Sequence, residues 1–192
     1  MTYKTVIFDF DGTLLDTKSL EQHFHLFKNT QKFTKEHTEG RKQFLTHVKE
    51  CREYEGMRET LDFIKSNGYD IYIVTGGSKD KVLTFIKDFN LRDVFDPKHI
   101  ISCYAKGRFN GRIYKRGGNP TLFNICLEKF NLNPSTCIAF GNEVCDKLAA
   151  NNANITAYNC LWGADADEAA DMKLNYKDST IESPRDIINL LN

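Results

Sequence analysis

Apolar and polar residues follow one another in blocks along the chain, and each block has the length and period of a strand or a helix. Residues 3–10, YKTVIFDF, form a nearly continuous apolar run that predicts a buried strand. Residues 57–67 carry apolar side chains at helical spacing and are followed by Gly68, a residue that commonly ends helices. Residues 70–77, DIYIVTGG, then predict a second strand that runs into a glycine turn.

The same alternation continues toward the end of the chain. Residues 79–90 place Val82, Phe85, Ile86 and Phe89 on one helical face. Further helices are predicted over residues 120–132, 147–153 and 183–191, and further strands over residues 136–142 and 154–158. Strands separated by helices indicate βαβ units. We therefore expect an α/β fold with a doubly wound, mainly parallel, Rossmann-like sheet.

Residues 17–55 interrupt this alternation with two amphipathic stretches, SLEQHFHLFKN and EGRKQFLTHVKECREY. Their candidate buried side chains are Phe24, Phe27, Phe44, Leu45 and Val48. We expect a small helical cap over the edge of the sheet, with residues 1–16 and 56–192 forming the core domain. The histidines of the segment, His23, His25 and His47, show no i, i+4 pair around a glutamate and are interpreted as residues of solvated helix faces.

Composition narrows the class of protein. The 192 residues include 26 basic and 26 acidic side chains, so no bulk attraction to nucleic acid or membrane is expected. The six cysteines form no CxxC pair, which argues against a zinc site or a compact disulfide framework. The chain shows neither a signal-peptide pattern nor an apolar stretch of about 20 residues. These features predict a reduced, cytoplasmic protein without a membrane span.

Polar residues gather where three predicted strands end, at residues 9–13, 75–77 and 141–146. The carboxyl ends of parallel strands lie at one edge of a sheet, which is where ligands bind in such folds. Asp9 and Asp11 are two residues apart in a strand-like run and would lie on the same side. Like charges at this distance are unfavourable unless a cation or a proton relieves them. The pattern therefore predicts a site for charge chemistry at this edge.

The ordered motifs DFDGTLLDT, VTGG, a lysine and GNEVCDKLAA resemble the four motifs of the haloacid dehalogenase-like (HAD) superfamily. The segments CLWG and TIESPRDIINLL also resemble segments of its phosphatases, so the resemblance covers nearly the whole chain. In that family an aspartate at the position of Asp11 is typical of phosphatases and is absent from dehalogenases. The resemblance thus implies a Mg²⁺-dependent phosphomonoester hydrolase that acts on a phosphorylated substrate.

The resemblance also implies roles for individual residues. Asp9 would be the nucleophile that forms an aspartyl-phosphate. Asp11 would protonate the leaving oxygen and then activate water. Thr75 and Gly76 would bind the transferring phosphate through the hydroxyl and neighbouring backbone amides. Lys115 would supply the cation that offsets charge on Asp9 and on the phosphoryl oxygens.

The position of that cation stays open at the level of the sequence. The family usually places the lysine close to a proline at a helix start, whereas RGGN separates Lys115 from Pro120. Arg116 and Lys106 are therefore competing candidates. The surrounding segment, residues 106–118, is basic and contains aromatic residues. In a neutral protein it is interpreted as lining for an anionic substrate, before a plain solvated loop or a nucleic-acid contact.

The fourth motif departs from the phosphatase pattern, which resembles GDxxxD and uses its first aspartate to bind Mg²⁺. Here Asn142 occupies that place. Because carboxylates are the usual protein ligands of Mg²⁺, the amide predicts weaker metal binding. Glu143 is a candidate substitute ligand, and Asp146 would hold a metal-bound water or orient the catalytic lysine. Asp9 and Asp11 complete the expected magnesium ligands.

Two alternative functions remain at this stage. Asn142 favours a catalytically weak or inactive phosphate-binding or regulatory module, whereas the intact Asp9 and Asp11 pair argues against it. A phosphotransferase would pass the phosphoryl group to an acceptor other than water. Because the cap is short, we expect an open mouth that admits a bulky substrate such as a phosphorylated protein side chain, a lipid headgroup or a nucleotide.

Overall fold

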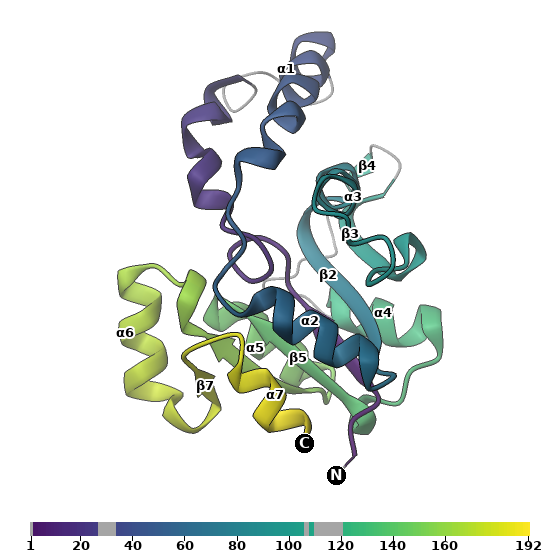
Figure 1. Cartoon of the computed structure of the whole chain (residues 1–192), viewed down its shortest axis with the longest axis vertical. Coiled ribbons are helices and arrows are strands. Elements are labelled where there is room, and N and C mark those ends of the chain that lie inside the picture. Colours follow the sequence, from purple (N-terminus) through teal and green to yellow (C-terminus); the bar gives the residue numbers. More distant parts are fainter. Residues whose placement is uncertain (1, 27–33, 106–107, 110–120) are drawn as a thin grey trace.

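A sheet of seven strands forms the centre of the computed structural model, which describes residues 2–26, 34–105, 108–109 and 121–192 (Figure 1). The strand order is β4-β3-β2-β1-β5-β6-β7, and neighbouring strands are parallel except for β4, which is antiparallel to β3. The strands are β1 (Thr5–Phe8), β2 (Asp70–Ser78), β3 (Ile100–Ala105), β4 (Arg108–Phe109), β5 (Cys137–Gly141), β6 (Thr156–Cys160) and β7 (Thr180–Ile181). The predicted α/β fold with a mainly parallel sheet is confirmed.

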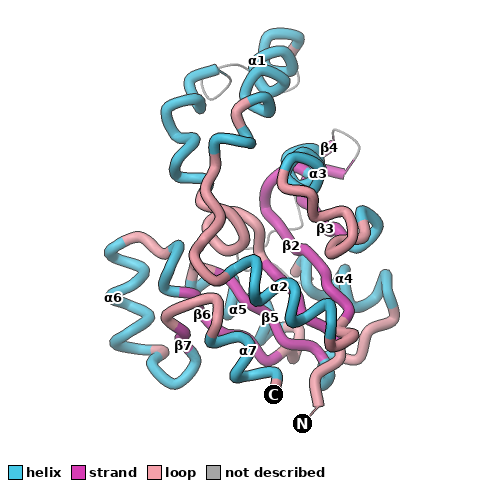
Figure 2. The backbone as a smooth tube through the Cα atoms, viewed as in Figure 1, coloured by secondary structure: helices cyan, strands magenta, loops and turns pink. Residues whose placement is uncertain are grey.

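Helices cover both faces of this sheet (Figures 1 and 2). The α-helices of the core are α2 (Met57–Ser66), α3 (Lys79–Asp88), α4 (Leu122–Phe130), α5 (Val144–Asn152), α6 (Ala166–Asn175) and α7 (Asp186–Leu191). Short 3-10 turns are η3 (Pro97–His99), η4 (Pro134–Thr136), η5 (Leu161–Gly163) and η6 (Lys177–Ser179). Among the helices of the described residues, none is long and apolar enough to cross a lipid bilayer.

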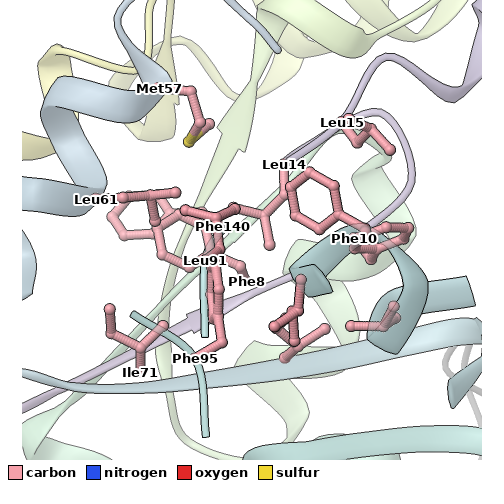
Figure 3. Close-up of a cluster of buried hydrophobic side chains, with 14 of the residues drawn as sticks. Phe8, Phe10, Leu14, Leu15, Met57, Leu61, Ile71, Leu91, Phe95 and Phe140 are labelled. Atoms are coloured by element: carbon pink, nitrogen blue, oxygen red, sulfur yellow. The ribbon is translucent and has the colours of Figure 1, made fainter. Parts of the chain in front are cut away.

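Alternate side chains of β1 enter two separate hydrophobic clusters, one on each face. Val6 and Phe8 belong to the cluster that contains the buried side chains of α2, α3 and α7. Ile7 belongs to the cluster with α4 and α5. Figure 3 shows Phe8 in the first cluster, close to Leu61 of α2 and Phe140 of β5. Burial of β1 on both faces explains why its sequence is a continuous apolar run rather than an alternating one.

The elements between β1 and α2 are helical and stand away from the sheet (Figure 2). They are the 3-10 helix η1 (Thr17–Leu26), the α-helix α1 (Lys35–Thr46) and the 3-10 turn η2 (Val48–Glu50). A bridge pairs Asp16 with Arg52, where the chain leaves the core and returns to it. Arg41 Nη2 of α1 lies 3.6 Å from Asp80 Oδ2 of α3, and this ion pair connects the segment to the core. The division into a core and a cap of residues 17–55 stays a prediction.

The buried side chains expected in the cap are partly described. Phe44 and Val48 are buried, and Leu45 packs against the core cluster. Phe27 and the side chain of Phe24 lie outside the described part of the structure. The cap therefore shares one hydrophobic cluster with the face of the sheet that α2 and α3 cover.

Candidate functional site

The three polar segments predicted to converge do so. Strands β2, β1 and β5 are neighbours in the sheet and run parallel, so their carboxyl ends lie at one edge. Residues 9–13 follow β1, residues 75–77 end β2, and residues 141–146 join β5 to α5. The site is built at this edge.

A tight turn after β1 presses against the end of β5. Asp9 is only 3% exposed, and its backbone N–H donates to the carbonyl of Phe140 at 2.9 Å. Gly12 has a φ of +77°, and its N–H donates to the carbonyl of Leu15 at 2.9 Å. A Cβ atom on Gly12 would lie 2.6 to 2.9 Å from the amide atoms of Asn142. Both the backbone angle and the close approach therefore require glycine at this position.

The hydroxyl of Thr13 joins the turn to Asn142. Thr13 Oγ1 lies 3.0 Å from Asn142 Oδ1 and 3.4 Å from Asp9 Oδ2, so both oxygens face one hydroxyl. Asn142 Nδ2 donates to the carbonyl of Gly163 at 3.1 Å, and Trp162 Nε1 donates to the carbonyl of Thr13 at 3.0 Å. A carboxylate in place of the Asn142 amide would direct an oxygen at the Gly163 carbonyl. The Asn142 amide thus suits its local hydrogen-bond partners better than a carboxylate would.

The end of β2 provides a hydroxyl and backbone groups beside Asp11. Thr75 is 1% exposed, and its Oγ1 accepts a hydrogen bond from the N–H of Gly77 at 2.9 Å. Within the described residues this hydroxyl donates no hydrogen bond, so it can donate to a bound anion. Gly76 is exposed, and a Cβ on Gly77 would lie 3.0 Å from Asp11 Oδ2. This geometry is compatible with phosphate binding at the predicted positions.

Sequence reasoning missed a cation at this edge, Lys81 of α3. Its ammonium forms an ion pair with Asp11 Oδ1 and lies 5.5 Å from the centre of the Phe10 ring. The side chains of Lys81 and Asp11 are 14% and 35% exposed. Ser78 caps the helix by accepting from the N–H of Lys81 at 3.4 Å. A serine N-cap directly after a predicted strand end was the available signal, because it places Lys81 in the first turn, next to that edge.

The junction of β5 and α5 gathers two carboxylates and a thiol. Asp146 is 2% exposed, and its Oδ2 accepts from the N–H of Glu143 at 3.3 Å. A Cβ on Gly141 would lie 2.4 to 2.8 Å from Asp146 side-chain atoms, so the carboxylate packs directly on the glycine backbone. Cys145 Sγ lies 3.2 Å from Glu143 Oε2. One ligand atom from each of Glu143, Cys145 and Asp146 lies within 4.8 Å of the others.

A buried thiol lies beneath the acidic groups. Burial, and then the charges of Asp146 and Asp9, raise the pKa of Cys160 well above its ordinary value. Cys160 therefore stays a neutral thiol and adds no charge to the site.

The predicted cation of the third motif cannot be located. Lys115, Arg116 and Lys106 all lie outside the described residues, as does most of the basic segment 106–118. Of that segment only the backbone of β4 is described. The assignment of Lys115 thus stays a prediction.

The pattern of the haloacid dehalogenase-like hydrolases matches residues 19–159, more than half of the chain. The chain belongs to this family. The matched range begins at residue 19, after the Asp9–Thr13 turn, so the roles expected of that turn stay predictions. No curated protein sequence matches this HAD-like hydrolase. The predicted family and the predicted hydrolase class are confirmed.

Solved structures share the fold of this HAD-like hydrolase. A predicted phosphoglycolate phosphatase from Haemophilus somnus is 18% identical over 100% of this chain and 99% of its own, with a TM-score of 0.72. A HAD hydrolase of family IA, variant 3, from Entamoeba histolytica is 17% identical over 98% and 97%, with a TM-score of 0.70. A HAD family hydrolase from Deinococcus radiodurans, with bound phosphate and sodium, is 15% identical over 98% and 95%, with a TM-score of 0.68.

The residues at the sheet edge of this HAD-like hydrolase fit a hard divalent ion. The candidate donors are the oxygen atoms of Asp9 and Asp11, which follow β1, and of Asn142, Glu143 and Asp146, which follow β5. Oxygen donors of this kind are the ligands that Mg²⁺ prefers. The missing Cβ of Gly12 allows the turn to lie close to Asn142, whose amide oxygen contacts the hydroxyl of Thr13.

Proposed function

We propose that this HAD-like hydrolase is a Mg²⁺-dependent phosphomonoester hydrolase that works through an aspartyl-phosphate on Asp9. The observation that most directly supports this proposal is the environment of Asp9, a buried carboxylate where the ends of three strands meet. Thr13 Oγ1 lies 3.4 Å from it, and Thr75 lies at the end of the neighbouring strand β2. A carboxylate is already deprotonated near neutral pH, which suits it to act as a nucleophile without a separate base.

The reaction would proceed in two balanced steps. In the first, a carboxylate oxygen of Asp9 forms a bond to phosphorus, the phosphorus–oxygen ester bond breaks, and the leaving oxygen takes a proton from Asp11. In the second, water gives its proton to Asp11 and attacks the aspartyl-phosphate, which releases inorganic phosphate and restores Asp9. Thr75 and the amides at Gly76 would orient the phosphoryl oxygens, since positioning and charge stabilisation dominate this chemistry.

The magnesium ligands we propose are Asp9, Asp11 and Asn142, with Glu143 as a further ligand and Asp146 holding a metal-bound water. The ion would supply positive charge at the phosphoryl oxygens. The Deinococcus relative, with its bound phosphate and sodium, supports an anion and a cation at this fold. Lys115 remains our candidate for the third-motif cation.

The substrate we propose is a phosphorylated compound with some bulk, because the described cap consists of only η1, α1 and η2. A cytoplasmic location also stays part of the proposal. All six cysteines lie in the described part of the chain and each is a thiol, which supports a reducing compartment.

The test is hydrolysis of an aryl phosphate by wild type, Asp9→Asn and Asp62→Asn across a range of Mg²⁺ concentrations. Asp62 is an exposed aspartate of α2 and serves as the matched control. We expect Mg²⁺-dependent release of phosphate that Asp9→Asn abolishes and Asp62→Asn retains. Equal turnover by wild type and Asp9→Asn would overturn the mechanism.

Two further outcomes separate the alternative functions. Phosphate binding by wild type without turnover or a trapped phosphoenzyme, across several phosphomonoesters, would indicate a binding module. A phosphorylated acceptor alcohol in place of free phosphate would indicate a phosphotransferase.

A further inference from the structure

Two histidines and a glutamate of the cap meet, although His23 is 27 residues from Glu50 in the chain. His23 lies in η1, His47 ends α1, and Glu50 lies in η2. His23 Nε2 lies 3.0 Å from Glu50 Oε2, and His47 Nδ1 lies 2.6 Å from Glu50 Oε1. The two imidazole rings are stacked, with centroids 3.6 Å apart and planes 10° apart. The three side chains thus come together where η1 runs beside α1 (Figure 1).

The spacing of these atoms suits a single metal ion. The three ligand atoms lie within 4.8 Å of one another. Around a tetrahedral Zn²⁺ with bonds of about 2.0 to 2.2 Å, neighbouring ligand atoms lie about 3.3 Å apart. The distances of 3.0 and 2.6 Å run to the two different oxygens of Glu50, and the two rings are nearly parallel, so a common ion requires the rings to turn toward it as well as to move apart. An ion would replace the protons that otherwise connect the ring nitrogens to the carboxylate.

The cluster offers donor types that bind transition metals. Neutral imidazole nitrogen and ionised carboxylate are the forms that bind metals. With both rings neutral, the three side chains together carry one negative charge, which attracts a divalent cation.

Solvent reaches the cluster from one side. The side chains of His23, His47 and Glu50 are 18%, 31% and 44% exposed. This provides an entry path and leaves room for water as a further ligand, as in zinc sites with three protein ligands. Imidazole suits zinc, nickel, copper and iron, whereas Mg²⁺ prefers oxygen. The cluster is thus chemically different from the oxygen-rich edge of the sheet.

We propose that His23, His47 and Glu50 bind one divalent transition-metal ion, with Zn²⁺ as the probe, and that the ion joins η1 to the corner between α1 and η2. This site is independent of the proposed phosphatase chemistry. Its location links it to the core, because η2 packs against α3, the helix that carries Lys81. A bound ion would therefore hold the cap in place beside the sheet edge.

The test is calorimetric titration of the metal-free full chain with Zn²⁺, in the presence of millimolar Mg²⁺ that fills the oxygen-rich edge. We expect one equivalent of Zn²⁺ at this site. Removing a direct ligand in His23→Asn or Glu50→Gln should weaken its affinity at least about tenfold, since even outer-shell changes cost 10- to 100-fold. Bound Zn²⁺ should also raise the melting temperature of the wild type, because the three ligands are held together only in the folded cap.

Two matched variants make the result specific. His25→Asn changes a histidine of the same helix η1 whose Nδ1 lies 2.7 Å from the carbonyl of Gln22, and it should bind Zn²⁺ like the wild type. Cys145→Ser disrupts the second cluster of potential ligands, at the start of α5, and should retain the cap site. Absence of Zn²⁺ binding, or binding that Cys145→Ser abolishes and His23→Asn retains, would overturn the proposal. Absorption bands of bound Co²⁺ that disappear in His23→Asn would support it independently.

Discussion

The ammonium group of Lys81 lies against the carboxylate of Asp11. Asp11 follows the end of β1, whereas Lys81 lies in the first turn of α3, directly after β2. This cation lowers the cost of placing Asp11 two residues from the buried Asp9. A protein side chain therefore relieves part of the crowding that the DFDGT motif creates, alongside the proposed metal.

Replacement of Lys81 should impair turnover more than it impairs folding. Lys81→Gln removes a charge-assisted contact worth about 1.5 to 3 kcal/mol. If the contact stabilises the transition state by that amount, its loss lowers kcat/KM for an aryl phosphate about 10- to 100-fold. Lys81→Arg keeps the charge and should lose less. Lys87→Gln, in the exposed last turn of the same helix, is the control, and an unchanged kcat/KM in Lys81→Gln would refute the role.

Replacement of Asn142 by aspartate should strengthen metal binding but weaken the local hydrogen bonding. Asn142→Asp loses the 3.1 Å bond to the Gly163 carbonyl and brings a negative oxygen toward it. We expect a loss of about 1 to 3 kcal/mol in the free energy of unfolding without Mg²⁺. Saturating Mg²⁺ should recover part of that loss, because the added carboxylate strengthens binding to the folded state.

Urea unfolding with and without Mg²⁺ measures both effects. Asn142→Ala is the comparison, since it loses the same hydrogen bond without adding a charge, and Mg²⁺ should not restore its stability. The interpretation fails if Asn142→Asp is as stable as the wild type in metal-free buffer.

Apolar runs in the sequence predicted the strands and helices that bury many side chains, and they missed a helix that buries few. The strands β1, β2 and β5 were identifiable because they are buried on at least one face over most of their length. Helix α6 was missed because Met172 is its one buried side chain, while Leu174 is 81% exposed. Helix α5 begins at Val144 rather than at the predicted residue 147, since its first turn carries polar residues of the site.

The spacing of residues along the chain could not predict contacts between separate segments. The helical pattern of residues 79–90 identified the apolar face of α3, but it carries no information about the partner of Lys81. His23 and His47 were interpreted as solvated because pair rules consider one helix at a time, whereas these rings stack between η1 and the end of α1. The Asn142 amide likewise depends on the Gly163 carbonyl, which a linear motif does not show.

Two glycines have nearly the same φ angle but different surroundings, so a comparison of them distinguishes the cost of a left-handed backbone from the cost of close packing. Gly12 and Gly68 have φ values of +77° and +76°. A Cβ on Gly12 would meet Asn142 at 2.6 Å, whereas a Cβ on Gly68 would meet nothing within 4 Å. Gly68→Ala should therefore cost about 1 to 2 kcal/mol from the left-handed backbone alone. Gly12→Ala should cost about 1 to 3 kcal/mol more from overpacking and should also reduce activity.

Chemical denaturation of both variants gives the comparison. Equal destabilisation would mean that the turn after β1 can move away from Asn142 without cost. That result would weaken the argument that Gly12 holds the metal ligand in place.

The thiols should differ in reactivity according to burial. Burial raises the pKa of Cys51 to about 11 and that of Cys126 to about 12, whereas the ordinary value is 9.0. Only the thiolate reacts with iodoacetamide, so a raised pKa lowers the reactive fraction at a given pH. At pH 8, about a thousandth of Cys51 is thiolate, and its labelling rate should rise about tenfold per pH unit toward pH 11. The half-buried Cys145 should react sooner.

Peptide mass spectrometry after timed labelling measures these rates, with a denatured sample in which all six cysteines react as the control. The folded state also holds the protons of Cys51 and Cys126 more tightly than the unfolded state does. Their stabilisation is therefore complete below pH 9.0 and is lost as the pH rises toward 11, so the free energy of unfolding should fall across that range. Labelling of Cys51 at the rate of Cys145 at pH 8 would contradict the burial of η2 against the core, and with it the link between the cap and the sheet edge.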